Sequence, residues 1–200
     1  MNAIRKHIVD NKAEFLLGFF IFLTATIIGA INSGKISTEQ AQMLKDYIEP
    51  LLMPESAGSI NSGSIFIADG INHLKFVLIA AVSSFSLKLF PLLLLAFVTK
   101  GYQLGFSLGF ISSYFGRDGI MLGTSSAILS YIFTIPIYFL ILVTVFKHCR
   151  KINGIGNGRD GQKNKEILSC LVFLPVVYCF LCLFTLAEAF LTPLIIDFMN

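Results

Sequence analysis

The sequence predicts an all-α, polytopic membrane protein, a bundle of about five transmembrane helices that forms one membrane domain over residues 1–200. Hydrophobic residues make up 55% of the chain and charged residues 14%, whereas a soluble domain is about 45–50% apolar and about 25% charged. A soluble fold of this length could not bury so much apolar side chain. The apolar residues also gather in runs long enough to cross a bilayer, which takes about 20 residues. The net charge of +3 is too small to indicate a nucleic-acid partner.

The expected spans follow from these runs in order, at residues 15–32, 71–86, 90–115, 119–146 and 167–196. The first has a basic start, but its apolar run is long for a signal peptide, so we expect a retained anchor. The second and third share one apolar block that is too long for a single helix. We place the break at Ser83 to Lys88, because Pro91 then falls in the first turn of the third span, where proline is tolerated. A break at Lys100 would leave too short a remainder.

Basic residues predict the orientation. Most Lys and Arg residues lie in the N-terminal tail and in the loop 147–166, and short basic loops stay on the cytoplasmic side. With five spans these two segments share that side, so the N-terminus is expected inside and the C-terminus outside. The basic loop 147–166 is then expected to touch anionic lipid headgroups. The segment 33–70 becomes an external loop.

The external loop carries a helix signature. Ser37 and Gln40 fit a capping box, and the apolar residues that follow are spaced for one helix face. Pro50 is expected to kink this helix or end it early. The helix would either lie on the membrane surface or cap the bundle, or it would present a docking surface to an extracytoplasmic partner.

A small-residue pattern marks the third span, where Gly101, Gly105, Gly109 and Ser113 recur every four residues. This spacing places them on one helix face, and small residues there let another helix approach closely. The pattern predicts packing against another span of the same chain. Packing against a second copy, in a homo-oligomer, or against another membrane protein is the alternative.

Charged residues inside the spans need partners. Glu188 in the fifth span is costly in hydrocarbon unless it is paired, protonated or near water. We expect it to pair with Lys75 or His73 at the outer start of the second span, or with Lys100 at mid-depth. A proton or ion relay is the alternative, although a transporter usually carries more than one buried acid.

The chain shows no catalytic, cofactor or metal motif. Cys179 and Cys182 have CxxC spacing, but they lie in an apolar run without a second ligand pair. The glycine-rich stretch 154–161 lacks the Gly-Lys-Ser/Thr of a phosphate-binding loop. We therefore expect a protein that is not an enzyme and that needs no cofactor or metal.

Several short motifs, each present once, follow one another in a characteristic order over nearly the whole chain. They are Gly18 and Gly29, NHLK at 72–75, KGYQLGFSLGF at 100–110, Gly116 and Gly119, Ile135-Pro136, and EAFLTP from Glu188 to Pro193. In this order and spacing the chain resembles the stage II sporulation protein M family.

The resemblance implies a non-catalytic membrane scaffold of the sporulation engulfment complex, located in the septal or engulfing cell membrane. It would recruit or hold the peptidoglycan-degrading stage II sporulation proteins D and P. Pro193 would end the family's C-terminal motif and have a structural role. A permease-like component of a transport system is the alternative, and the low charge content argues against it because a transport path needs several converging polar groups.

Overall fold

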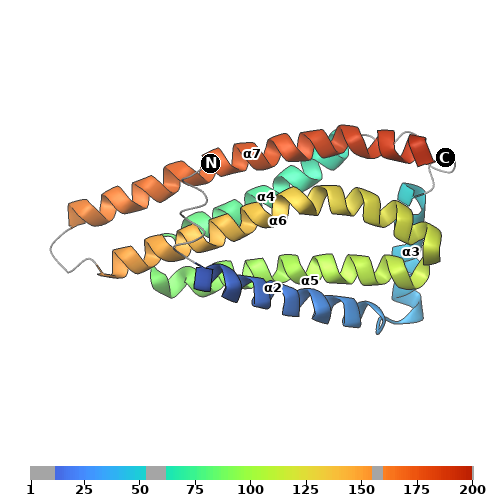
Figure 1. Cartoon of the computed structure of the whole chain (residues 1–200), viewed down its shortest axis with the longest axis horizontal. Helices are drawn as coiled ribbons and strands as arrows, with labels where there is room; N and C mark the ends of the chain where they lie inside the picture. The colour runs from blue at the N-terminus through green and yellow to red at the C-terminus, as the bar shows by residue number, and fades with distance from the viewer. Residues whose placement is uncertain (1–11, 53–61, 155–159, 200) are drawn as a thin grey trace.

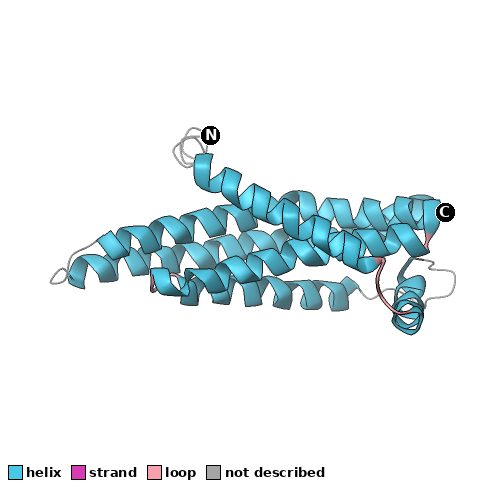
Figure 2. Cartoon of the chain, turned by 90° about the horizontal axis from the view of Figure 1, so that it is seen from below, coloured by secondary structure: helices cyan, strands magenta, loops and turns pink. Residues whose placement is uncertain are grey.

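The computed structural model describes residues 12–52, 62–154 and 160–199. These residues form helices joined by short connections, without a strand in the part of the chain that is described (Figure 2). The elements are α2 (Lys12–Ser33), α3 (Thr38–Leu52), α4 (Ser62–Ser83), the 3-10 turn η1 (Leu87–Leu89), α5 (Phe90–Tyr114), α6 (Gly116–Gly154) and α7 (Asp160–Met199).

Five of these helices, namely α2, α4, α5, α6 and α7, are long and apolar enough to cross a membrane. They run up and down along the long axis of the molecule (Figure 1), so the prediction of an all-α bundle with five spans is confirmed. We call the end that carries the α6–α7 connection the basic end, and the end beside α3 the cap end. Which end faces the cytoplasm stays a prediction.

The helices extend beyond the predicted spans. α4 begins at Ser62, ahead of residue 71, and α6 and α7 continue into the segment 147–166 that the sequence assigns to a loop. Hydropathy marks only the part of a helix that suits hydrocarbon, whereas backbone hydrogen bonds allow the same helix to continue into water.

The connection between α4 and α5 lies where the polar break predicts it. Helix α4 ends at Ser83, and α5 begins at Phe90 with Pro91 in its first turn. Between them the Ser86 side chain accepts a hydrogen bond of 3.3 Å from the backbone N–H of Lys88. Proline costs no hydrogen bond in a first turn, because its missing N–H would have no helical partner there.

Helix α3 lies across the cap end, roughly perpendicular to the bundle (Figures 1 and 2). Its capping box is confirmed: the backbone N–H of Gln40 donates to Ser37 Oγ over 3.3 Å, and the N–H of Ser37 donates to Gln40 Oε1 over 3.4 Å. The helix continues past Pro50 to Leu52. Pro50 therefore lies in the last turn and does not end the helix early.

The core lies where α4, α5, α6 and α7 meet, and it is almost entirely apolar. Its largest fully buried side chains include Phe76, Phe97, Leu93, Ile141 and Leu174. The outward faces are apolar as well, as on α2 and α7. A helix that is hydrophobic all round is typical of a membrane span, because lipid covers the face that water would contact in a soluble bundle.

Candidate functional site

A polar pocket of about 110 Å³ interrupts the apolar bundle between α4, α5 and α6. Most of its lining residues are three or four apart along their helix, so each helix contributes one face. The lining consists of Asp69, Asn72 and His73 from α4, Lys100 and Gln103 from α5, and Tyr131, Thr134 and Tyr138 from α6.

A buried hydrogen bond between α4 and α6 lies at the back of the pocket. His73 Nδ1 and the Tyr138 hydroxyl lie 2.7 Å apart, and the two residues are only 8% and 3% exposed. A polar group without a partner costs several kcal/mol in a membrane interior. This bond gives each residue a partner and ties α4 to α6.

Two opposite charges face the pocket. Asp69 and Lys100 are both half-buried, and each acts electrostatically on the other. No direct ion pair within 4.0 Å joins these two described side chains. Among the described residues the two charges thus act on each other across the pocket and not through a direct contact, in surroundings where charge is poorly screened.

The pocket is closed toward the basic end. About one helical turn from the pocket in that direction, each of the three helices carries a buried apolar side chain next to His73, Lys100 or Tyr138. These side chains are Phe76, Phe97 and Ile141, with exposed fractions of 1%, 0% and 0%. Phe76 also packs on Tyr138, with ring centroids 4.3 Å apart. The exposed residues Asn72 and Gln103 form the rim. The pocket is thus blind, with a polar back and an apolar floor.

A second feature is the close contact of α2 with α5, which we call the glycine seam. A Cβ atom added to Gly105 would overlap the backbone carbonyl of Thr26, and one added to Gly29 would overlap that of Tyr102. At Gly101 the nearest atom, Phe22 O, would be 3.0 Å away. Glycines on both helices therefore let the two backbones touch.

The seam ends one turn before the predicted pattern does. A Cβ on Gly109 would meet Ser33 and Ala30 of α2, the latter with its Cα at 3.0 Å. Ser113, the fourth residue of the sequence pattern, is exposed. The face defined by the three glycines is occupied by α2 of the same chain.

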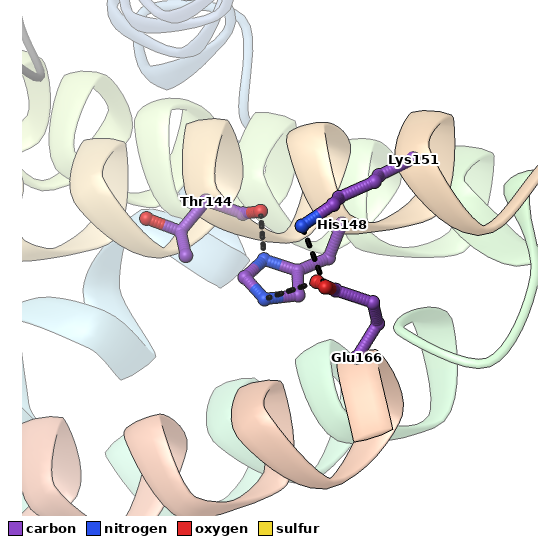
Figure 3. Close-up of polar contacts among 4 residues, drawn as sticks. All are labelled: Thr144, His148, Lys151 and Glu166. Carbon is purple, nitrogen blue, oxygen red and sulfur yellow. Dashed lines mark hydrogen bonds and ion pairs between the residues drawn. The ribbon is translucent and has the colours of Figure 1, made fainter. Parts of the chain in front are cut away.

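A charged cluster joins α6 and α7 at the basic end (Figure 3). Lys151 Nζ donates to Glu166 Oε1 over 2.5 Å, and His148 Nε2 lies 4.0 Å from Glu166 Oε2. His148 Nδ1 donates to the carbonyl oxygen of Thr144 over 3.0 Å. Lys151 is 63% exposed, and exposed pairs contribute only about 0–1 kcal/mol. This cluster positions the two helix ends but has no separate chemical role that the geometry supports.

The predicted buried charges differ in their surroundings, although Lys75 acts electrostatically on Lys100. Lys100 reaches the pocket, whereas Lys75, which the sequence groups with the buried charges, is exposed. Lys75 lies on α4 outside the pocket lining, on a face that neighbouring helices do not cover. Glu188 and Pro193 lie in α7, but their side chains are outside the described set, so the pairing of Glu188 stays a prediction.

Sequence reasoning missed most of the pocket. Asp69 was expected in the external loop, Gln103 appeared only within the motif at 100–110, and Thr134 and Tyr138 were not singled out at all. The available signal was polar residues at helical spacing on three separate spans, such as 69/72/73 and 131/134/138. That signal becomes visible only when the three faces are compared with one another.

Comparisons with known proteins place the chain in a family. The family model described as Stage II sporulation protein M matches residues 18–193. The match includes both the glycine seam and the pocket. Neither the curated proteins nor the solved structures contain a match to this chain.

Proposed function

Because the chain belongs to the stage II sporulation protein M family, we propose that it is a non-catalytic scaffold of the engulfment complex. Family membership and five apolar helices indicate a sporulation-related, multi-pass membrane protein. In the proposed role it recruits or holds the peptidoglycan-degrading stage II sporulation proteins D and P at the septal or engulfing membrane. The partner proteins degrade peptidoglycan, and this chain holds them at the membrane.

The observation that carries this proposal is α3 on the cap end. Ala41 of α3 is only 4% exposed, which anchors the helix, whereas Glu39, Gln42 and Asp46 are exposed. Met43, in the midst of these polar residues, is 73% exposed. An exposed flexible apolar side chain with a polar rim is typical of a protein contact. In the predicted orientation this surface faces the peptidoglycan.

The experiment is co-purification of tagged full-length chain from sporulating cells, with stage II sporulation proteins D and P as the readout. Wild type is expected to retain both partners, and Met43→Arg to lose most of them at unchanged protein level. Asn164→Arg is the matched control, since Asn164 is exposed at the opposite end of the bundle. Wild type without a wall hydrolase would overturn the scaffold role. Full retention by Met43→Arg would overturn the assignment of the surface to α3.

The alternative of a permease-like component has one observation in its favour, the polar pocket. Transport requires a path that continues through the membrane, with polar groups or water along it. Below the pocket the three helices instead meet through Phe76, Phe97 and Ile141. A closed, fully apolar floor supports a static bundle over a conducting one, and for this reason we favour the scaffold.

A further inference from the structure

The polar pocket has the properties of a binding site that the scaffold role does not require. Asp69 and Lys100 line it without pairing directly, and the His73–Tyr138 hydrogen bond fixes its back. Residues needed only for packing in a membrane would be apolar or mutually paired, since unpaired charge is costly there. Two opposite charges held apart around a polar cavity leave room for a group that bridges them.

We propose that the pocket binds a small zwitterion, in which an ammonium group and a carboxylate or phosphate are joined by a short aliphatic link. The ammonium would face Asp69, and the anionic group would face Lys100. A simple cation would be repelled by Lys100 and a simple anion by Asp69, so a ligand that carries both charges fits best.

The size and shape of the pocket restrict the ligand further. A volume of about 110 Å³ is well below the roughly 300–1,000 Å³ of drug-sized sites, and it equals the space of only a few water molecules. The exposed rim residues Asn72 and Gln103 can both donate and accept hydrogen bonds. Such a rim suits a polar group that enters from outside and stops at the apolar floor.

The same chemistry exists in two sources, a free amino acid and the headgroup of phosphatidylethanolamine. The test uses the purified full-length chain in nanodiscs of phosphatidylglycerol, which lacks an ammonium group. One arm titrates glycine and alanine by calorimetry. The other adds phosphatidylethanolamine or, as a control without N–H donors, phosphatidylcholine, and counts retained lipid by native mass spectrometry.

Wild type is expected to bind in one arm and to ignore phosphatidylcholine. Lys100→Met and Asp69→Asn should each weaken binding by about tenfold or more, because each removes a charged hydrogen-bond partner. Lys88→Met is the matched control, since Lys88 is exposed outside the pocket lining, and it should bind as wild type does. Asn72→Leu at the rim provides a second variant if a charge replacement fails to fold.

The arm that responds identifies the source. Binding of amino acids alone assigns a free solute, and retention of phosphatidylethanolamine alone assigns a lipid headgroup. No binding in either arm, equal retention of phosphatidylcholine, or unchanged affinity in folded Lys100→Met would each overturn the proposal. These outcomes are independent of partner co-purification, so the proposal can fail while the scaffold role stands.

Discussion

Replacement of Gly105 by alanine tests the glycine seam most directly. The added Cβ would lie 2.6 Å from the carbonyl carbon of Thr26 and 2.9 Å from its Cα, whereas carbon atoms prefer about 3.5–4.0 Å. Backbone atoms cannot rotate away, so α2 and α5 must separate by about 1 Å. Overpacking of this kind costs about 1–3 kcal/mol. We expect Gly105→Ala to lower the free energy of unfolding by about 2 kcal/mol.

The control is the same substitution elsewhere in a helix. A Cβ on Gly70 in α4 would meet no atom within 4 Å, so Gly70→Ala should leave stability unchanged or raise it by about 0.5–1 kcal/mol through helix propensity. Gly101→Ala should cost less than Gly105→Ala, because its nearest contact is 3.0 Å. The assay is SDS titration in mixed micelles, followed by energy transfer between labels on α2 and α5. If Gly105→Ala is as stable as Gly70→Ala, the two backbones do not touch as described.

Three further predictions concern the pocket, the basic end and the topology. Tyr138→Phe should lower the free energy of unfolding by about 1–3 kcal/mol in the same titration, because His73 then has no buried partner; an unchanged midpoint would contradict the hydrogen bond. Glu166→Gln should cost under about 1 kcal/mol and lose even that effect near 1 M NaCl, because its partner Lys151 is exposed; a large, salt-independent loss would contradict this. Alkaline phosphatase fused after Asn200 should be active and a fluorescent protein there dark; the reverse pattern would refute the outside C-terminus.

The number of spans could be predicted from the sequence because it depends on a local quantity. Each apolar run is continuous in the chain, and a bilayer imposes one length on all of them. The Ser37–Gln40 capping box is equally local, with both hydrogen bonds formed within four residues. The helix ends were less predictable, since α6 and α7 continue beyond the predicted apolar spans into polar sequence, where hydropathy no longer reports on them.

The pocket could not be predicted because it is formed by residues that are far apart in the chain. His73 and Tyr138 are 65 residues apart in the chain, and Lys100 comes from a third helix. Taken singly, Asp69 resembles a boundary residue and Tyr138 an interfacial aromatic. Which helix faces meet is decided by packing of all five spans, and this information is not contained in any one of them. The low charge content therefore argues against a continuous transport path but leaves room for a single polar pocket.

The glycine seam has a consequence for biogenesis. Helix α2 ends at Ser33 and its close partner α5 ends at Tyr114, so about 80 further residues must be made before α5 is complete. At about 5–20 residues per second this takes roughly 4–16 s. Throughout that interval α5 has not yet filled the groove of small residues on α2, although α4 is made before α5. Helix α2 thus finds its close partner only after α3 and α4 have been made, and a membrane chaperone of this chain would have its best opportunity in that interval.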